Sequence, residues 1–191
     1  PDPLTPIDET LRALEDLIRD GKIRYVGCSN LPAWQMVEAH FEAELANIDG
    51  FVSAQEEYNM LNRGIEKEVL PVARKYGFGL LPYFPLASGL LTGKYKRDAM
   101  PEDGRLTVNP RFANRGYLSD ENLDLVEKLE TFAEERDHTL LELAFAWLLA
   151  EPATASVIAG ATKPEQVTSN VAAASWVLTP GEKAAVDEML A

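Results

Sequence analysis

Apolar side chains recur at helical spacing in the first part of the chain. They form one stripe of a predicted helix: Ile7, Leu11, Leu14, Leu17 and Ile18. Thr5, Pro6 and Asp8 match a helix start, with a hydroxyl cap, proline at the first helical position and an acid at the third. Gly21 follows the last apolar position and predicts the end of the helix. The pattern is that of an amphipathic helix with one buried face.

Four short apolar runs have the length of strands. They are Ile23–Cys28, Phe51–Gln55, Phe78–Tyr83 and Ser156–Ala159. Helical patterns lie between them: one follows the turn Ser29–Pro32 and carries Trp34, Val37, Phe41 and Leu45, and another spans Glu66–Tyr76, with Pro71 inside it and Gly77 at its end. Because each connection is long enough to cross over, the strands are predicted to pair in parallel, as in an α/β fold.

The second half of the chain is mainly helical in pattern. Ser119 opens a helix whose apolar stripe is Leu123, Val126, Leu129, Phe132 and Ala133. Thr139 and Glu142 form a capping box, and their helix, which runs to Leu149, is apolar on most sides and is expected to be buried. Thr162 and Thr179 cap two further helices. Residues 96–118 lack periodicity and predict a long loop, but no domain boundary, because strands on both sides of it need each other.

The stretch Phe78–Tyr95 joins a predicted strand to a loop of small residues. Its sequence is FGLLPYFPLASGLLTGKY. A loop of this kind lets backbone N–H groups approach a phosphate closely, and Tyr83 lies at the strand end, where its ring could stack on a ligand. From these residues alone, a ligand-binding loop and a plain connection remain equally open interpretations.

Composition and charge narrow the classes of function. The chain has 191 residues, 31 acids against 18 bases, and a net charge of −13, which argues against binding of nucleic acid. The single cysteine, Cys28, rules out an intrachain disulfide and favours a reducing compartment, so we expect a cytoplasmic protein. No apolar run has the length of a membrane span, and no signal peptide is apparent. Because the chain begins at Pro1 and not at Met, we expect a processed or excised segment.

Two motifs carry a family resemblance that continues along the whole chain. The stretch Phe78–Tyr95 resembles the seventh strand and following loop of aldo-keto reductases, and GCSNL at Gly27–Leu31 resembles the end of their fifth strand. The resemblance implies a (β/α)8 TIM barrel. It also implies that residues 1–191 are the C-terminal half of this single domain, with strands five to eight and most of the cofactor site.

The resemblance implies NADP(H)-dependent reduction of aldehydes or ketones to alcohols. The family's catalytic aspartate, tyrosine, lysine and histidine all lie upstream of the segment that this chain resembles. We therefore assign no catalytic residue here and predict that the chain alone is inactive. Two alternatives remain open: a non-catalytic NADP(H)-binding regulatory subunit, like the potassium-channel β subunits of the family, and a structural fragment.

Several polar or aromatic residues fall at predicted strand ends, where barrel enzymes place their active sites: Ser29, Asn30, Gln55, Tyr83 and Gly160. The resemblance places Ser29, Asn30 and Gln55 on the nicotinamide carboxamide and Tyr83 against the face of the ring. Without the resemblance the simpler interpretations are a helix cap at Ser29 or Asn30, an exposed strand terminus at Gln55 and a core aromatic at Tyr83.

The resemblance also assigns the phosphate and adenosine contacts of the cofactor. These residues are Pro85, Leu86, Ala87, Ser88, Gly89, Leu90, Thr92, Lys94, Arg105, Gly160, Thr162, Gln166 and Asn170. Leu86–Leu90 match the loop that covers the pyrophosphate, and Lys94 and Arg105 match the cations on the side of the 2′-phosphate. Gly160, Thr162, Gln166 and Asn170 match the segment that holds the adenosine end, where Ser169 stands in place of the family's usual glutamate.

Other residues give weaker signals for chemistry. Cys28 has the pattern of a packed thiol at a strand end. His40 and His138 lie far apart without neighbours at metal-ligand spacing, so no metal site is predicted. The expected partners are a small-molecule carbonyl substrate and, because the edge strands carry no protecting Lys or Pro, the missing N-terminal half or a second copy of the chain. No nucleic-acid or membrane partner is expected.

Overall fold

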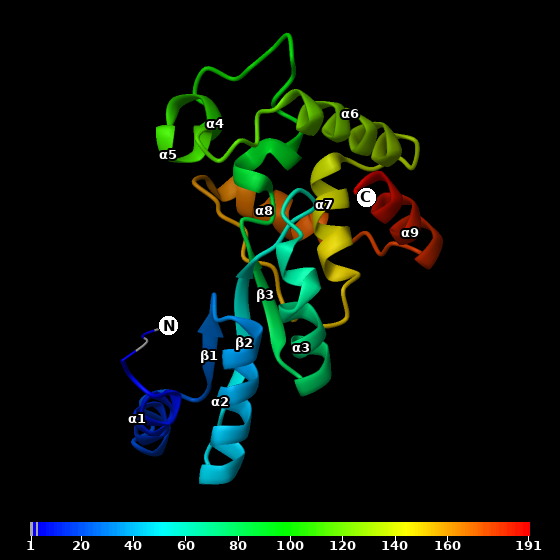
Figure 1. Ribbon diagram of the computed structural model, residues 1–191. Helices are drawn as coiled ribbons and strands as arrows, with labels where there is room; N and C mark the ends of the chain where they lie inside the picture. The colour runs from blue at the N-terminus through cyan, green and yellow to red at the C-terminus, as the bar shows by residue number, and fades with distance from the viewer. Residues whose placement is uncertain (1, 3) are drawn as a thin grey trace. The chain divides into compact units, whose positions relative to one another are not determined.

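The computed structural model describes residue 2 and residues 4–191 in two compact units (Figure 1). Unit 1 comprises the chain up to Glu57 together with Gly64–Leu81 and Pro152–Ser156, and unit 2 comprises Tyr58–Arg63, Pro82–Glu151 and Val157–Ala191. Pro1 and Pro3, which fall within the predicted domain 1–191, lie outside the described residues. No boundary between the units falls in the 96–118 segment.

Three strands form one sheet in the order β1-β2-β3. They are β1 (Val26–Ser29), β2 (Phe51–Glu57) and β3 (Gly79–Tyr83). β1 and β2 pair in parallel, with Cys28 opposite Ala54 and Ser29 opposite Gln55, which confirms the predicted direction of pairing. The first strand begins three residues later than the apolar run at Ile23 suggested.

The prediction of a fourth strand at Ser156–Ala159 is wrong, because this part of the chain makes only isolated bridges. Leu80 bridges Thr154 in unit 1, and Tyr83 bridges Ile158 in unit 2. The next rung beyond Leu80 would need a donor at residue 82, and Pro82 has no N–H to donate. The carbonyl of Pro82 still accepts from the Ile158 N–H at 2.9 Å, so contact persists without a ladder.

The described part of unit 1 also contains three α-helices, which are labelled in Figure 1: α1 (Ile7–Arg19), α2 (Ala33–Ala46) and α3 (Val69–Tyr76). A short 3₁₀ helix, η1 (Gly64–Lys67), precedes α3. The predicted cap at Thr5 is wrong: Pro6 takes the cap position, and the Thr5 hydroxyl donates to Asp2 instead, at 2.8 Å. Pro71 lies in the first turn of α3, where its missing N–H leaves no hydrogen bond unmade.

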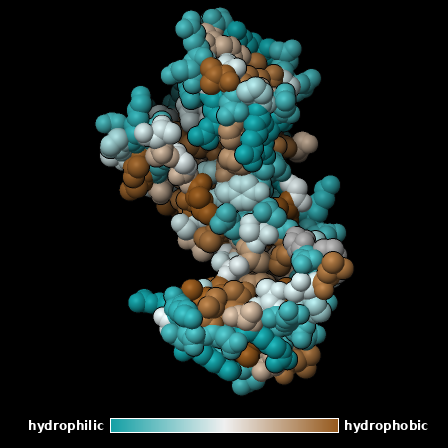
Figure 2. Space-filling view, turned by 90° about the vertical axis from the view of Figure 1, so that its left-hand side faces the viewer, coloured by the Kyte–Doolittle hydropathy of each residue, from teal (hydrophilic) through white to brown (hydrophobic). Residues whose placement is uncertain are grey.

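α2 buries three alanines and Met36 and exposes several large apolar side chains. Ala33, Met36, Ala39 and Ala43 are buried, which lets the helix approach β1, β2 and α1 closely. Its large apolar side chains lie outside: Trp34, Phe41 and Leu45 are 63%, 46% and 81% exposed. Apolar side chains of this kind appear as brown patches among polar ones on the surface in Figure 2.

Unit 2 contains four helices of ten or more residues: α6 (Asp120–Glu134), α7 (Leu140–Leu149), α8 (Pro164–Ala173) and α9 (Pro180–Met189). Ser119, Thr139 and Thr179 cap three of them through their side-chain oxygens, as predicted. The N-cap of α8 is Lys163 and not Thr162. α7 is buried along most of its length, as expected for a helix that is apolar all round.

Two aromatic residues fix the packing within unit 2. The Trp147 indole, 1% exposed, donates to Asp187 Oδ1 at 2.8 Å and ties α7 to α9. The Tyr95 hydroxyl is buried and accepts from the Leu106 N–H at 3.1 Å. The polar atoms of these two buried aromatic side chains are therefore both paired.

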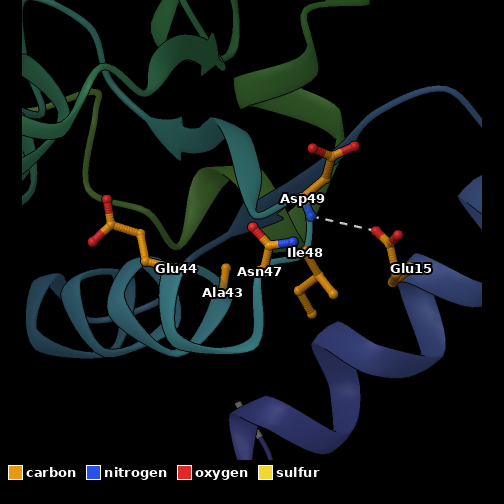
Figure 3. A pocket seen from close by; sticks show the side chains of 6 residues that line it. All are labelled: Glu15, Ala43, Glu44, Asn47, Ile48 and Asp49. Carbon is orange, nitrogen blue, oxygen red and sulfur yellow. Dashed lines mark hydrogen bonds between the residues drawn. The ribbon is translucent and has the colours of Figure 1, made fainter.

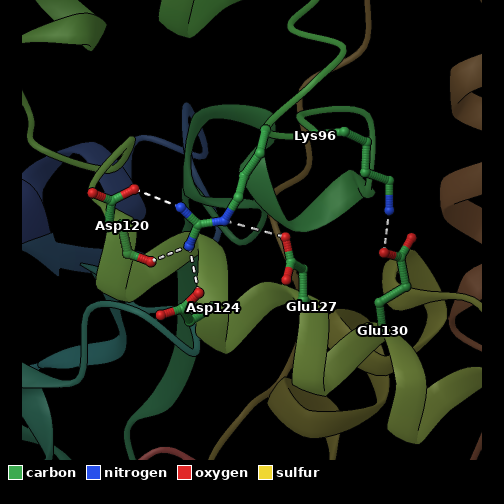
Figure 4. A network of polar contacts seen from close by, with 6 residues as sticks. Lys96, Asp120, Asp124, Glu127 and Glu130 are labelled. Carbon is green, nitrogen blue, oxygen red and sulfur yellow. Dashed lines mark hydrogen bonds and ion pairs between the residues drawn. The ribbon is translucent and has the colours of Figure 1, made fainter.

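The segment 96–118, expected to be an irregular loop, contains two single-turn helices, α4 (Arg105–Val108) and α5 (Pro110–Ala113). Charges hold its start on α6: Arg97 pairs with Asp120, Asp124 and Glu127, and Lys96 pairs with Glu130 (Figure 4). No helix among the described residues is long and apolar enough to cross a membrane.

Candidate functional site

The carboxyl ends of β1 and β2 bring three of the predicted site residues together in unit 1. The Ser29 hydroxyl donates to the Gln55 carbonyl at 2.9 Å and accepts from Asn30 Nδ2 at 2.8 Å. Ser29 and Gln55 are register partners in the sheet, so the strand pairing itself places their side chains at one edge. All three side chains are exposed and remain accessible to a ligand.

A buried carboxylate, that of Glu56, accepts a hydrogen bond at this end of the strands. Glu56 is only 5% exposed, and its Oε1 accepts from the Asn30 N–H at 2.9 Å. Burial raises the pKa of Glu56, while the hydrogen bond from Asn30 opposes the shift. Burial also raises the pKa of the neighbouring Cys28 thiol to about 11, with a further contribution from the Glu56 charge, so the thiol stays protonated.

Sequence reasoning did not single out Glu56. The signal was present, because alternation along β2 puts residue 56 on the same face as Ala54, which is fully buried. An acid at a position that the strand pattern assigns to the core is the kind of exception that calls for a partner.

Tyr83 lies at the end of β3 in unit 2 and is half-buried. Its carbonyl accepts from the Tyr58 N–H at 3.4 Å, and its backbone bridges Ile158, two residues before Gly160. Its ring contacts that of Phe84 edge-on, with 5.4 Å between centroids. The backbone of Tyr83 is thus fixed at the strand end, as the sequence predicted.

The loop that follows contains an unusual run of left-handed backbone. Phe84, Ala87 and Ser88 have φ values of 52°, 46° and 59°, and Gly89 has a φ of 104°. Non-glycine residues seldom adopt this region, and each instance costs about 1–3 kcal/mol. Successive turn conformations of this kind can form an anion-binding concavity of backbone N–H groups. In this loop the Ala87 and Gly89 N–H groups donate to the carbonyls of Phe84 and Leu86, at 3.0 and 2.7 Å.

Two side chains make this loop suitable for an anion. The Ser88 hydroxyl is buried, and it has no hydrogen-bond partner among the residues that the structure describes. The Lys94 side chain lies against the loop at Gly89. A Cβ added to Gly89 would be 3.5 Å from Lys94 Cε and 3.7 Å from Lys94 Nζ. Its ammonium also lies 5.2 Å from the centre of the Tyr95 ring. A cation, an unpaired hydroxyl and a turn-rich backbone therefore meet in one short segment.

The other predicted loop residues divide into packing and polar groups. The side chains of Pro85, Ala87 and Leu90 are buried, so only their backbones can reach a ligand. The Thr92 hydroxyl donates to the Gly89 carbonyl at 2.7 Å and closes the turn. Leu86 is half-buried at the start of η2 (Ala87–Thr92).

Arg105 begins α4 and is exposed. Its guanidinium lies 5.2 Å from the centre of the Phe112 ring, and Phe112 in turn contacts Phe84 with 5.9 Å between centroids. Aromatic and cationic contacts therefore run from the strand end to Arg105 within unit 2.

The predicted adenosine contacts lie at the start of α8. Gln166 Oε1 accepts from the Thr162 N–H at 2.6 Å, the Thr162 hydroxyl at 3.1 Å and the Lys163 N–H at 3.2 Å. The Gln166 side-chain oxygen is therefore already used to cap the start of α8. Gly160 is exposed, and Asn170 is half-buried one turn along the helix.

A separate open depression of roughly 530 Å³ in unit 1 was not anticipated (Figure 3). It is lined by Glu15, Ala43, Glu44, Asn47, Ile48 and Asp49. The Asp49 N–H donates to Glu15 Oε2 at 3.3 Å. Its carboxylates do not converge on a metal geometry, and no group of three or more metal-ligating side chains occurs in the described part of the chain.

Comparison with known proteins decides the family. The model of the aldo/keto reductase family matches residues 1–191. The chain belongs to the aldo/keto reductase family.

Individual relatives support the same assignment. The chain is 39% identical to a putative voltage-gated potassium channel subunit beta of Schizosaccharomyces pombe over 100% of its own length and 57% of that protein. It is 35% identical to an NADH-specific methylglyoxal reductase of Escherichia coli K12 over 97% of the chain and 54% of the relative. It is 33% identical to an L-glyceraldehyde 3-phosphate reductase of Escherichia coli O157:H7 over 98% and 55%.

The chain thus spans about half the length of the curated relatives it matches. Aldo/keto reductases are oxidoreductases with (β/α)8 barrels and nicotinamide cofactors, and this chain shows the α/β character and parallel sheet of part of such a barrel. The residues present fit the phosphates of a dinucleotide, because the buried Ser88 hydroxyl lacks a partner and Lys94 lies against the same loop.

Proposed function

We propose that this chain is the C-terminal, cofactor-binding half of an NADP(H)-dependent aldo/keto reductase that converts aldehydes or ketones to alcohols. In this proposal, residues 1–191 provide strands five to eight of a single barrel domain. The observation that carries it is the loop Phe84–Gly93, in which a strained backbone surrounds the unpaired Ser88 hydroxyl and the ammonium of Lys94.

When bound, the nicotinamide would supply the hydride, and the residues of this chain would bind and orient the cofactor. Ser29, Asn30 and Gln55 would hold the carboxamide, which needs both donors and acceptors. Tyr83 would stack on the ring. We assign no proton donor to this chain, so a complete reaction would require an acid from outside these residues.

The phosphate contacts would lie in unit 2. The Phe84–Gly93 loop would take the pyrophosphate, while Lys94 and Arg105 would select NADP(H) through its 2′-phosphate. Both are bases in a chain of net charge −13, so a phosphate would depend on such local cations. Gly160, Thr162, Gln166 and Asn170 would take the adenosine end. The NADH-specific name of one relative makes cofactor preference the part of the proposal that most needs measurement.

Isothermal titration with NADPH and NADH tests the proposal. The wild-type chain should bind both, NADPH more tightly, and Lys94→Glu and Arg105→Glu should weaken NADPH far more than NADH, since only NADPH carries the extra phosphate. Lys128→Glu, an exposed change of the same charge on α6, should have little effect. Equal losses for both cofactors would remove the assignment of Lys94 and Arg105, and no binding by the wild type would leave only a structural fragment.

A second candidate is a non-catalytic NADP(H)-binding regulatory subunit. The observation in its favour is the 39% identity to the putative channel subunit of Schizosaccharomyces pombe. Carbonyl turnover separates the two candidates. A protein that includes this chain and the missing catalytic residues should oxidise NADPH when given an aldehyde, whereas a regulatory subunit would bind NADPH without appreciable turnover.

The remaining proposals concern partners and setting. A small-molecule carbonyl compound would be the substrate, and the N-terminal half or a second copy of the chain would cover the open sheet edges. A cytoplasmic location would suit the single cysteine. Light scattering of the isolated chain tests whether a partner must cover the sheet edges. A stable monomer that melts cooperatively would show that no such partner is needed.

A further inference from the structure

The buried carboxylate of Glu56 has no role in the function proposed above. It is the one charged side chain among the fully buried residues of unit 1 that the structure describes. Burial of an acid is costly unless a specific partner repays it. Alternation along β2 puts Glu56 on the same face as the buried Ala54, where an apolar residue would be expected. Its presence therefore points to the hydrogen bond that it makes.

That hydrogen bond holds one backbone position. Glu56 Oε1 accepts from the Asn30 N–H at 2.9 Å, whereas the alternative acceptor, the Gln55 carbonyl, is 3.3 Å from the same nitrogen. Asn30 has a φ of 56°, in the left-handed region that asparagine tolerates better than most residues. A charged acceptor is stronger than a neutral one, so the carboxylate is the better restraint on this conformation.

The conformation of Asn30 decides where two predicted ligand groups point. With its backbone fixed, Asn30 Nδ2 donates to the Ser29 hydroxyl, and that hydroxyl donates in turn to the Gln55 carbonyl. The two bonds leave the Ser29 oxygen a single arrangement of donor and acceptor sites. Release of the Asn30 backbone would let both side chains rotate away from it.

We propose that Glu56 is a positioning residue that holds the Ser29–Asn30 turn in the orientation that receives the nicotinamide carboxamide. Glu56 itself would not touch the cofactor. The inference rests on the proposed function, which assigns Ser29 and Asn30 to the carboxamide, and it adds the element that prepares them before the cofactor arrives. A prepared site avoids the cost of ordering those groups upon binding.

The test compares NADP⁺ with 2′,5′-ADP, which carries the adenosine and the 2′-phosphate but no nicotinamide. Glu56→Leu removes the acceptor and should weaken NADP⁺ by about tenfold, the effect of one charged hydrogen bond, while 2′,5′-ADP keeps its affinity within about twofold. Glu56→Gln keeps an oxygen at the same place and should restore NADP⁺ binding to within about threefold of wild type. Glu38→Leu, an exposed acid on α2, is the matched control and should change neither affinity.

A measurement without ligand separates failure of this inference from failure of the proposed function. The amide proton of Asn30 should resonate downfield in the wild type and in Glu56→Gln, and should move upfield in Glu56→Leu. If Glu56→Leu does not fold, Glu56→Asp replaces it, since the shorter side chain cannot reach Asn30 without movement of the backbone. A wild-type chain that binds neither ligand would refute the proposed function while the Asn30 resonance still reports on the turn.

Three results would overturn the inference. The first is an equal loss of NADP⁺ and 2′,5′-ADP affinity in Glu56→Leu, which would indicate general damage to the fold. The second is NADP⁺ binding by Glu56→Gln as weak as that by Glu56→Leu. The third is an Asn30 amide resonance that does not respond to substitution at residue 56.

Discussion

The two segments that we propose to bind the cofactor differ in how many of their polar groups already have hydrogen-bond partners. At the strand end of unit 1, Ser29, Asn30 and Glu56 bond to one another or to the neighbouring strand. In the Phe84–Gly93 loop of unit 2, the buried Ser88 hydroxyl has no partner in the described chain, and three non-glycine residues hold left-handed backbone. The strand end pairs these polar groups without a ligand, although Asn30 is itself left-handed, whereas the loop has three left-handed non-glycine residues and an unused donor.

Under the proposed function, this difference would follow from what each group of the cofactor requires. A carboxamide is neutral and directional, so its receptors must be oriented in advance, and hydrogen bonds within the protein do this. A phosphate is charged and accepts many hydrogen bonds, so a loop with an unpaired hydroxyl and a nearby cation can gain enough from binding to offset its strain. The comparison leads to four predictions, which run from the largest expected effect to the smallest.

The first prediction concerns Tyr95, a buried residue that packs next to the loop at Gly89. Tyr95 is 1% exposed, contacts Lys94 and accepts from the Leu106 N–H, so Tyr95→Ala should reduce the free energy of unfolding by about 3–5 kcal/mol. Tyr95→Phe keeps the ring and should lower the free energy of unfolding by only about 1–3 kcal/mol, because it leaves the buried Leu106 N–H without its acceptor. Denaturant titration followed by circular dichroism measures both. Equal effects of the two variants would show that the hydroxyl, and not the ring, supports the loop.

The second prediction concerns the strand end. A Cβ on Gly27 would lie 2.3 Å from Ser53 Oγ and 3.1 Å from the Ser53 carbonyl, so Gly27→Ala should destabilise unit 1 by about 1–3 kcal/mol through overpacking. The double variant Gly27→Ala/Ser53→Ala removes the closer contact and should recover most of the loss. Chemical denaturation of both variants checks this. A double variant no more stable than the single one would place the strain in the backbone of the β1–β2 pair.

The third prediction sets the two segments against each other directly. Ser88→Ala removes a buried hydroxyl without a partner and should leave the chain as stable as before or stabilise it by about 1 kcal/mol. Ser29→Ala removes a hydroxyl with two partners and should destabilise the chain by about 0.5–1.5 kcal/mol. Thermal melting of the two variants measures the signs. Destabilisation by Ser88→Ala would mean that its hydroxyl has a partner in solution, and the comparison would fail.

The fourth prediction uses pH. Burial raises the pKa of Glu56 in the folded protein. The stability that this group contributes is therefore lost as pH rises above the ordinary glutamate pKa of about 4.3. Glu56→Gln should become more stable than wild type towards neutral pH.

Glu142 is the opposite case: burial disfavours its charge, but hydrogen bonds from Thr139 and His138 outweigh burial and lower its pKa. Its contribution is present above about pH 4.3 and is lost as pH falls, so Glu142→Gln should be less stable than wild type at neutral pH.

Urea denaturation at a series of pH values between acid and neutral measures both differences. The stability differences of Glu56→Gln and Glu142→Gln from wild type should have opposite signs at neutral pH, and both should shrink in acid. Differences of the same sign at neutral pH would contradict the assignment of burial as the main influence on Glu56.

Local sequence determined the features that depend on residues within a few turns of each other. The stripe from Leu123 to Ala133, the caps at Thr139 and Thr179, and the end of α3 at Gly77 were all predicted and are confirmed. Each of these depends on hydrogen bonds or spacing inside one helix and its caps. The family motif around Tyr83 was likewise contiguous in the sequence, and the family match is confirmed.

The tertiary structure decided every feature that depends on a distant partner. The buried face of α2 follows from neighbours that are distant in the sequence, because Met36 packs with Cys28 and Ala54 of the sheet. No local rule placed Trp34 outside. The absence of a fourth strand follows from the alignment of Pro82 with a segment about 70 residues later in the chain, where an N–H was needed. The burial of Glu56 and its bond to Asn30 join residues 26 positions apart. Periodicity and caps are local energies, whereas these contacts exist only once separate strands and helices have come together.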